Sequence, residues 1–405
     1  MRDYYDALDD LLANATMSQT IEEVPIAEAE GRVLAQDLLV NYPAPQFDNS
    51  AMDGYAVNDV NRQEWKVIGI ISAGDESAQF TLQAGEAVRI FTGAGIPNNC
   101  DTVIQQELVE RDEDLIRIEA PFATNKNIRR QGEELQKGAL LLNANRIISP
   151  AVIGLLASQG YATVPCFKKL KVTVFSTGDE LTPLGQTLEI NQIYDSNRPM
   201  LLSLLRRFKF LEVQSGGAIE DNLDALKAHI TNAVDNQGQD VLVFSGGASV
   251  GEKDYLKQAL DELGEIEHWK MAIKPGKPFG WGKVGSATKV FILPGNPVAS
   301  YATSLLLAIP AMKRIAGVSI EKSKPFSFKV QADFEVPVNK SIRRDFKRAI
   351  IKNNEQGAWA ELLTTQDSHM LSGISYGDVL VEVPAEQSIK RGDFLNVYPL
   401  IGVHY

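Results

Sequence analysis

The sequence has 405 residues, of which 44% are hydrophobic and 23% are charged, and its formal net charge is −12. This length accommodates roughly two to four domains, and the composition is ordinary for a soluble globular protein. The negative charge argues against a broad nucleic-acid or anionic-membrane surface, so a small anionic ligand would need local lysines and arginines. Cys100 and Cys166 lack the spacing of a zinc site and indicate a reducing compartment, so we expect a cytoplasmic protein.

The start of the chain, MRDYYDALDDLL, is acidic and has no signal-peptide pattern. No apolar run approaches the roughly 20 residues that span a bilayer, so we expect no membrane segment. Apolar residues at helical spacing predict an amphipathic helix over Tyr4–Ala15. A mixed segment, Val24–Val40, and an extended segment with two prolines, Asn41–Phe47, follow.

The next part of the chain, residues 47–137, is predicted to be a small β-domain. Its predicted strands are Lys66–Ile71, Ala87–Phe91, Thr102–Glu110 and Leu115–Glu119, of which the last two should form a hairpin. The stretch DNSAMDGYA at 48–56 is too polar for a core and too specific for a linker. Two further polar stretches are the glycine loop TGAGIP at 92–97 and IRRQGEE at 128–134.

A helix is predicted from Pro150 to Ser158, with Ser149 as its N-cap and Gly160 beyond its end. This helix and the N-terminal helix flank the β-domain in the sequence. We therefore interpret residues 1–46 and 138–167 as one N-terminal domain into which the β-domain is inserted.

From residue 168 to residue 320, strands and helices alternate. The predicted strands are Leu170–Phe175, Glu212–Ile219, Val241–Phe244 and Val290–Leu293, and the predicted helices are Ser196–Phe208, Asn222–Asp235, Tyr255–Leu263 and Ala299–Ile315. This alternation predicts an α/β domain whose parallel sheet is covered by helices on both faces. Residues 321–405 return to short strands and predict a second small β-domain. Its strands are Phe326–Phe334, Asp345–Ile351, Val379–Val383 and Leu395–Pro399.

The stretch DVLVFSGGASVGEKDY at 240–255 combines a buried strand, a loop of small residues and a predicted helix start at Asp254. Free N–H groups and a helix dipole at such a turn favour an anion, although an ordinary βα turn would also contain glycines. Gly246 and Gly251 have P-loop spacing, but Glu252-Lys253 replaces the required GK[ST]. An ATPase P-loop is thus excluded, and the absence of GxGxxG after the first strand disfavours a dinucleotide fold.

The other strands of the α/β domain are also followed by polar or glycine-rich loops. These are STGDE at 176–180, Asp221, and PGNPVAS at 294–300, while WKMAIKPGKPF at 269–279 contributes Lys270, Lys274 and Lys277. Alone, each fits a common structural role, such as an N-cap, a solvated lysine or a turn. Because such loops meet at one edge of a parallel sheet, their coincidence predicts a binding site. Glu180, Asp221 and Asp254 could hold Mg²⁺ there, bridged to substrate phosphates.

These stretches resemble the molybdopterin molybdenumtransferase family of the MoeA type, which is related to the C-terminal part of gephyrin. The matching stretches are DNSAMDGYA at 48–56, TGAGIP at 92–97, IRRQGEE at 128–134, STGDEL at 176–181, IYDSN at 193–197, SGGASVGEKDY at 245–255, IKPGKPF at 273–279 and LPGNPVAS at 293–300. They run in family order across at least 250 residues. The resemblance implies a multidomain α/β plus β fold. Its parts are a three-layer α/β molybdopterin-binding domain, an inserted β-domain, an elongated dimerisation domain at the N-terminus and a small C-terminal domain like a β-barrel.

The resemblance also implies an activity in molybdenum cofactor biosynthesis. A family member inserts molybdate into adenylyl-molybdopterin and releases AMP, with Mg²⁺ assisting. It works as a homodimer whose clefts lie between the α/β domain of one chain and the other chain. Transient contacts with the adenylyltransferase and with molybdoenzyme maturation proteins are implied, and contacts with nucleic acid or membrane are not. Two alternatives are a molybdopterin adenylyltransferase and a non-catalytic scaffold like gephyrin.

Individual residues match the family motifs. The implied catalytic residues are Asp53, Thr92, Glu134, Glu180, Asp221, Asp254, Lys270 and Lys274. The implied substrate-binding residues are Ser245, Gly246, Gly247, Ser249, Lys277, Pro294, Gly295, Asn296, Pro297, Arg343 and Ser368. The acids Glu180, Asp221 and Asp254 are assigned to Mg²⁺ and to pterin or nucleotide contacts, and the lysines to phosphate or molybdate. The residues of the inserted β-domain are expected to reach the partner's site.

Three of these matches depart from the family pattern. Glu134 stands where the family commonly has Asp. The glycines that often precede the matched Arg and Ser are replaced by Ile342 before Arg343 and by Asp367 before Ser368.

Overall fold

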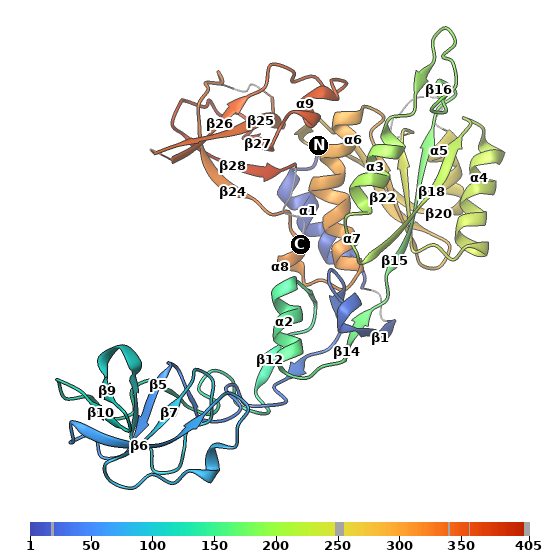
Figure 1. Cartoon of the computed structure of the whole chain (residues 1–405). Coiled ribbons are helices and arrows are strands. Elements are labelled where there is room, and N and C mark those ends of the chain that lie inside the picture. The colour runs from blue at the N-terminus through green and yellow to red at the C-terminus, as the bar shows by residue number, and fades with distance from the viewer. Residues whose placement is uncertain (18–19, 248–254, 339–340, 356, 401–405) are drawn as a thin grey trace. The chain divides into compact units, whose positions relative to one another are not determined.

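The computed structural model describes residues 1–17, 20–247, 255–338, 341–355 and 357–400. The chain divides into two compact units. The larger unit contains residues 1–36, 144–155 and 162–405, and the smaller contains residues 37–143 and 156–161 (Figure 1). Across the described ranges, every helix is too short or too polar to traverse a lipid bilayer.

The smaller unit is built on a six-stranded sheet with the order β8-β5-β7-β6-β10-β9. The strands are β5 (Gly54–Val57), β6 (Glu64–Ile71), β7 (Glu86–Ile90), β8 (Thr102–Gln105), β9 (Glu110–Asp112) and β10 (Leu115–Arg117). Two short antiparallel strand pairs connect the first residues of this unit with its last ones. They are β3 (Leu38–Leu39) with β12 (Leu140–Leu142) and β4 (Asn49–Ser50) with β11 (Ile128–Arg129). Tyr55 and Val57 face one core cluster and Ala56 faces the other, as alternation along a strand requires.

The predicted single strand over Thr102–Glu110 is wrong. A 3₁₀ turn at Gln106–Leu108 interrupts it and redirects the chain. As a result β8 pairs with β5, and only the short β9 forms the hairpin with β10.

A small antiparallel sheet stands at the start of the larger unit. It consists of β1 (Ile21–Pro25), β14 (Thr163–Phe167), β2 (Val33–Leu34) and β13 (Arg146–Ile147), in that order. A 3₁₀ turn, Ile26–Glu28, follows β1. The helix predicted from its Ser-Pro start is α2 (Pro150–Ser158).

The α/β part of the larger unit has a six-stranded sheet with the order β18-β15-β19-β23-β22-β20. Its parallel strands are β15 (Leu170–Thr177), β18 (Leu211–Ile219), β19 (Val241–Ser245) and β23 (Thr288–Leu293). The strands β20 (Gly264–Lys270) and β22 (Pro278–Val284) extend it in the antiparallel sense, which the sequence did not predict. A parallel pair, β16 (Leu181–Thr182) with β17 (Ile193–Tyr194), stands beside this sheet.

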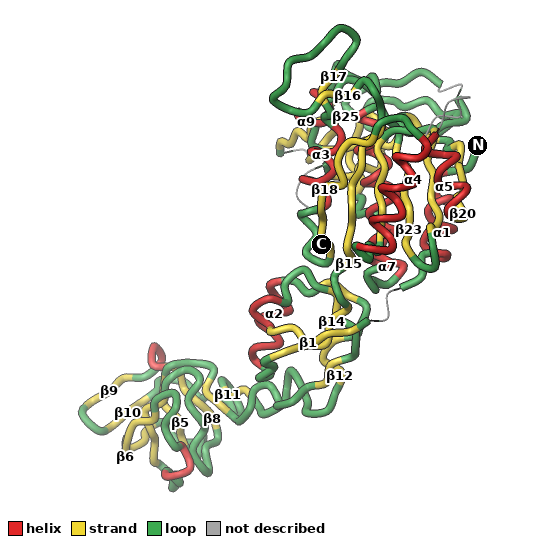
Figure 2. The backbone as a smooth tube through the Cα atoms, turned by 90° about the vertical axis from the view of Figure 1, so that its right-hand side faces the viewer, coloured by secondary structure: helices red, strands yellow, loops and turns green. Residues whose placement is uncertain are grey.

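Helices cover both faces of this sheet (Figures 1 and 2). One face carries α3 (Asn197–Leu205) and a long helix formed by α6 (Pro297–Thr303), a π-helical turn (Ser304–Ala308) and α7 (Ile309–Ile315). The other carries α5 (Tyr255–Leu263) and α4 (Leu223–Thr231), which continues as a π-helical turn (Asn232–Asn236). Val241 and Val243 of β19 pack on the face covered by α3, α6 and α7, and Leu242 and Phe244 pack on the face covered by α4 and α5. Burial on both faces explains the continuous apolar run of this strand.

The C-terminal residues form a closed five-stranded barrel, as the family resemblance implies. Its strands are β24 (Phe328–Ala332), β25 (Arg344–Asn354), β26 (Gly357–Leu362), β27 (Val379–Val383) and β28 (Phe394–Pro399). The barrel closes because β25 pairs with both β26 and β27. Strand β26 was not predicted. The short helices α8 (Ile320–Ser323) and α9 (Ser372–Ser375) accompany this part of the chain.

The N-terminal helix α1 (Tyr4–Asn14) connects the barrel to the α/β part. Its buried residues Tyr4, Leu8 and Leu11 share one core cluster with α7 and with Phe346 and Tyr398 of the barrel. The amphipathic pattern of the sequence thus corresponds to a helix packed against both parts of the larger unit.

Candidate functional site

A pocket of about 1210 Å³ lies at the carboxyl ends of the parallel strands in the larger unit. Many of the sequence-predicted site residues line it together: Glu180, Asp221, Ser245, Gly246, Gly247, Lys270, Lys274, Lys277, Pro294, Gly295, Asn296, Pro297, Arg343 and Ser368. Ser249 and Asp254 lie outside the described residues. Asp53, Thr92 and Glu134 belong to the smaller unit and are not among the lining residues.

Glycines allow the loops after β15 and β19 to approach each other. Gly246 has a φ of +103°, and a Cβ atom there would lie 2.9 Å from the carbonyl oxygen of Thr177. Gly178 has a φ of +141°, and a Cβ there would meet the Glu180 carboxylate at 2.5 Å. Both conformations disfavour side chains, and at Gly246 the absence of a Cβ lets the loop after β19 approach the end of β15, while at Gly178 it leaves room for the Glu180 carboxylate of the same loop.

Asn197, at the start of α3, holds two of the loops that line the pocket. Its Nδ2 donates to Ser245 Oγ at 2.8 Å and to the carbonyl oxygen of Gly295 at 2.6 Å. A carbonyl oxygen can only accept, so this contact fixes the orientation of the amide. Both hydrogens of Nδ2 are then used, and Oδ1 is buried without a hydrogen-bond partner.

A buried carboxylate lies two residues before Asn197. Asp195 is 2% exposed and accepts hydrogen bonds from Ser176 Oγ at 2.6 Å and from Arg198 Nε at 2.8 Å. These contacts fix the end of β15 to the start of α3. Asp195 and Asn197 were not among the predicted site residues, although the matching stretch IYDSN contains both.

The three lysines lie on a strand-rich segment, and not in the open loop that the sequence predicted. Lys270 ends β20, and Lys274 belongs to β21 (Ile273–Lys274). Strand β21 pairs in parallel with the first residues of β25, Lys274 opposite Asp345. Barrel pairing thus brings Arg343 to the same pocket, which is lined by four cationic side chains and by the carboxylates of Glu180 and Asp221.

The barrel also contacts the PGNP loop. Asn296 Nδ2 donates to Ser368 Oγ at 3.0 Å, and the N–H of Val298 donates to the carbonyl oxygen of Ser368 at 3.2 Å. Ser368 therefore sits at the start of α6 with both its side chain and its backbone engaged.

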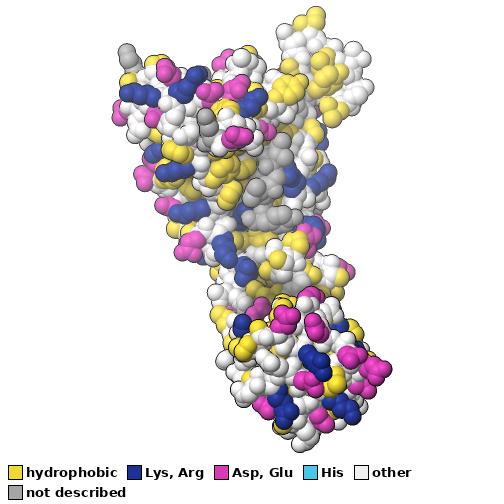
Figure 3. Space-filling model, turned by 60° about the vertical axis from the view of Figure 1, so that its left-hand side comes forward, with side chains coloured by type: hydrophobic (Ala, Val, Ile, Leu, Met, Phe, Trp, Pro, Cys, Tyr) yellow, Lys and Arg dark blue, Asp and Glu magenta, His cyan; other side chains and the backbone are white. Residues whose placement is uncertain are grey.

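The β16–β17 segment supplies an apolar wall. Ile193 and Tyr194 line the pocket and are also partly open to solvent. Figure 3 shows apolar side chains gathered on the projection at the top of the molecule, and the exposed apolar residues of this segment are Leu184, Leu188, Ile190, Ile193 and Tyr194.

The carboxylates of the pocket fit a divalent cation only in part. Among the described residues, no three His, Cys, Asp or Glu side chains are grouped closely enough to hold a metal ion. Glu180 and Asp221 nevertheless line the same pocket. Mg²⁺ is commonly bound by one or two carboxylates together with substrate phosphates, so this pair suits an ion that arrives with a phosphorylated ligand.

In the smaller unit, Asp53 and Thr92 form a tight pair. Asp53 Oδ1 accepts from both the backbone N–H and the hydroxyl of Thr92, each at 2.8 Å. These hydrogen bonds, the backbone one first, hold the pKa of Asp53 below its ordinary value. Glu134 is exposed, and its backbone N–H donates to the carbonyl oxygen of Ala44 at 3.0 Å.

Neither cysteine has the character of a nucleophile. Both are free thiols, and burial raises the pKa of Cys100 to about 12 and that of Cys166 to about 11. Thiols with such pKa values stay protonated at neutral pH, so thiolate chemistry is not available to them.

Comparisons with known proteins cover nearly the whole chain. The family model "MoeA N-terminal region (domain I and II)" matches residues 2–160, "Probable molybdopterin binding domain" matches 173–314, and "MoeA C-terminal region (domain IV)" matches 331–400. The molybdopterin molybdenumtransferase of Haemophilus influenzae is 36% identical over 405 residues, which cover 96% of this chain and 98% of the relative. A protein of the same name from Nostoc sp. is 34% identical over 330 residues, 79% of this chain and 75% of the relative.

Two solved structures of proteins from this family are also similar to nearly the whole chain. The structure of a molybdopterin biosynthesis MoeA protein from Pyrococcus horikoshii is 28% identical, with a TM-score of 0.82, and the match covers 98% of this chain and 100% of that chain. A second structure of such a protein from the same organism is 32% identical, with a TM-score of 0.75 and coverage of 99% and 100%.

Proposed function

Because this chain belongs to the MoeA family of molybdopterin molybdenumtransferases, transferases of molybdenum cofactor biosynthesis, we propose that it inserts molybdate into adenylyl-molybdopterin and releases AMP, with Mg²⁺ assisting. The observation that carries the proposal is the pocket at the sheet edge. There a glycine loop, the PGNP loop, three lysines and two carboxylates meet around about 1210 Å³. This volume exceeds that of typical drug-sized sites, roughly 300–1,000 Å³, and suits a pterin that carries a nucleotide.

The charges of the pocket match the two reactants. Molybdate and a phosphorylated dithiolene are both anions and repel each other when brought together. Lys270, Lys274 and Lys277 offset this repulsion with positive charge inside the pocket. Holding both reactants in one geometry lowers the barrier by removing the entropy cost of their encounter.

The carboxylates and the apolar wall would act on different parts of the substrate. Glu180 and Asp221 would hold Mg²⁺, which neutralises charge on the phosphate oxygens as AMP leaves. Ile193 and Tyr194 offer an apolar surface for a flat ring. Asn197 keeps the loops of Ser245 and Gly295 at a fixed separation.

We further propose a cytoplasmic homodimer in which Asp53, Thr92 and Glu134 of one chain reach the pocket of the other. The proposed domains are the N-terminal domain (1–46 and 138–167), the inserted β-domain (47–137), the α/β domain (168–320) and the C-terminal β-domain (321–405). The tight Asp53–Thr92 pair supports a shared role for these two residues.

The test is molybdate-dependent release of AMP from adenylyl-molybdopterin. Lys274→Met should raise the KM for molybdate at least 10-fold, because it removes a charge from the pocket. Lys283→Met is a matched control, since Lys283 lies on β22 of the α/β sheet, does not line the pocket and pairs with the exposed Glu265 at 3.2 Å. Wild-type protein that leaves the substrate unchanged in the presence of molybdate and Mg²⁺ would refute the proposal. Adenylate formed from ATP and molybdopterin would assign an adenylyltransferase instead.

A further inference from the structure

The segment that carries Lys270 and Lys274, here called the lysine segment, is held on one side by residue 2 and on the other by the barrel. On one side the N–H of Arg2 donates to the carbonyl oxygen of Lys270 at 2.9 Å, and the N–H of Ala272 donates to the carbonyl oxygen of Arg2 at 2.7 Å. On the other side the N–H of Arg344 donates to the carbonyl oxygen of Ala272 at 2.8 Å. The guanidinium of Arg2 also lies 4.2 Å from the ring centroid of Trp269. The backbone between Lys270 and Lys274 therefore lies between residue 2 and the barrel and is hydrogen-bonded to both.

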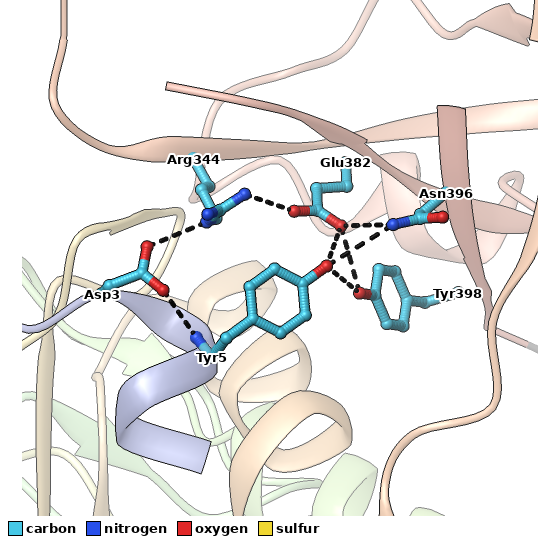
Figure 4. A network of polar contacts seen from close by, with 6 residues as sticks. All are labelled: Asp3, Tyr5, Arg344, Glu382, Asn396 and Tyr398. Atoms are coloured by element: carbon cyan, nitrogen blue, oxygen red, sulfur yellow. Dashed lines mark hydrogen bonds and ion pairs between the residues drawn. The ribbon is translucent and has the colours of Figure 1, made fainter. Parts of the chain in front are cut away.

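A polar network locks these two flanking segments together (Figure 4). Arg344 donates to Asp3 at 3.0 Å and to Glu382 at 2.8 Å. Glu382 is 3% exposed and also accepts hydrogen bonds from Tyr5, Asn396 and Tyr398, the one from Tyr5 at 2.7 Å. A buried carboxylate with this many donors is well compensated, whereas removal of one partner leaves it costly.

The same network acts on α1. Asp3 is the N-cap of the helix and accepts a hydrogen bond from the N–H of Tyr5 at 2.9 Å. Its other carboxylate oxygen binds Arg344. One side chain thus fixes the start of the helix and the start of β25 at once. We call Asp3, Arg344 and Glu382 the N-terminal clamp.

The clamp and the pocket lie on neighbouring residues of one extended segment. Successive side chains on extended backbone point to opposite sides. Arg343 accordingly lines the pocket, while Arg344 enters the network. Whatever fixes Arg344 therefore fixes the backbone that carries Arg343, and through the hydrogen bond to Ala272 it also fixes the segment that carries the lysines.

We propose that the N-terminal clamp is a positioning device for the pocket, which holds Lys270, Lys274 and Arg343 at a fixed spacing around the anionic substrates. The proposal rests on the proposed role of these cations in binding molybdate or phosphate. Cations gathered in one pocket repel one another before substrate binds, so their preorganisation needs support from outside the pocket. The clamp supplies that support from residues that do not line the pocket.

The experiment compares wild-type protein with Arg344→Met/Glu382→Gln, which removes both charges and leaves no unpaired buried carboxylate. Asp3→Asn is the second variant, because it removes the charge of a partly exposed carboxylate while Asn still caps the helix. Arg391→Met is the matched control, since Arg391 pairs with Asp333 on the barrel surface at 3.0 Å and lies outside the network. The readouts are the KM for molybdate, kcat, and amide hydrogen exchange of residues 270–274.

The clamp variants should raise the KM for molybdate at least 10-fold and speed exchange at residues 270–274 at least 10-fold, while Arg391→Met matches wild type. Equal KM and equal exchange in the wild type and in Asp3→Asn or the double variant would overturn the proposal. If the double variant does not fold, Asp3→Asn alone decides. Wild-type protein that releases no AMP would refute the proposed function, and the exchange comparison would still decide whether the clamp holds the lysine segment.

Discussion

Asn197 donates a 2.8 Å hydrogen bond to the hydroxyl of Ser245 and thereby ties the start of α3 to the loop after β19. Its second amide hydrogen binds Gly295, so one side chain sets the distance between two loops that line the pocket. Asn197→Ala removes both bonds. We expect kcat/KM to fall roughly 10-fold to 100-fold, since two hydrogen bonds contribute about 1–3 kcal/mol.

The control for this variant is Asn236→Ala. Asn236 also donates through its amide, to Asn232, but on an exposed helical turn away from the pocket. Steady-state kinetics of AMP release would show the difference. A kcat/KM of Asn197→Ala within 2-fold of that of Asn236→Ala would mean that the two loops keep their spacing without the amide.

Gly246→Ala tests how closely the loops after β15 and β19 must approach. The φ of +103° is unfavourable for alanine, and the added Cβ would lie 2.9 Å from the carbonyl oxygen of Thr177. Backbone strain of this kind costs about 1–3 kcal/mol, so we expect a lower Tm and weaker substrate binding. Gly154→Ala is the same chemical change in α2, where an added Cβ meets nothing within 4 Å. It should keep or raise the Tm, because alanine favours a helix by about 1 kcal/mol over glycine. Calorimetry on both variants checks this, and equal Tm values would contradict it.

Thr92→Val tests the pairing of Thr92 with Asp53. The hydroxyl donor disappears while the shape and the backbone N–H remain, so the pKa of Asp53 should rise part of the way toward its ordinary value. Thr92→Ser keeps the hydroxyl and should leave this pKa low. Carboxyl NMR titration of Asp53 measures both. If the pKa is the same in the two variants, the hydroxyl does not bind the carboxylate in solution.

Lys313 makes stability depend on pH. It is 7% exposed, it lies 5.7 Å from the ring centroid of Phe208, and desolvation lowers its pKa to about 8. The unfolded chain holds this proton up to about pH 10.4, so the free energy of unfolding should rise as pH increases from about 8 toward that value. At pH 7 the buried charge costs up to about 3 kcal/mol.

Lys313→Met removes that cost and should raise the Tm at pH 7, with the advantage over wild type shrinking above pH 8. Thermal unfolding at pH 7 and at pH 9.5 measures the change. Lys322→Met, an exposed lysine of α8, is the control and should leave the pH dependence unaltered. A gap between Lys313→Met and wild type that is the same at both pH values would show that Lys313 is neutral or solvated when folded.

The sequence predicted the layers of the α/β part because its central strands are buried on both faces and read as continuous apolar runs. The segment Val241–Phe244 shows this, with its side chains divided between two cores. Strand β22 was missed because Gly280 and Gly282 lower its strand propensity. A Cβ at Gly280 would lie 2.8 Å from the Ile292 side chain on β23, so glycine leaves room there for that side chain.

The candidate site was predictable where polar or glycine-rich residues directly follow a strand in the sequence, as at Glu180, Asp221 and the PGNP loop. The contribution of the barrel was less accessible, because Arg343 and Ser368 reach the pocket only through tertiary pairing. Asn197 acts through two contacts about 50 and 100 residues further along the chain. No local pattern encodes such contacts, and only the motif IYDSN drew attention to that segment.

The position of the lysine segment between residue 2 and β25 has a consequence for how the protein is made. Its partners lie about 270 residues before it and about 70 residues after it, so both contacts are non-local. Non-local contacts form late, and chains emerge from the ribosome N-terminus first. A nascent chain that has completed its α/β part still lacks the strand that completes the cation cluster. The pocket should therefore acquire its full set of cations only when the barrel has folded.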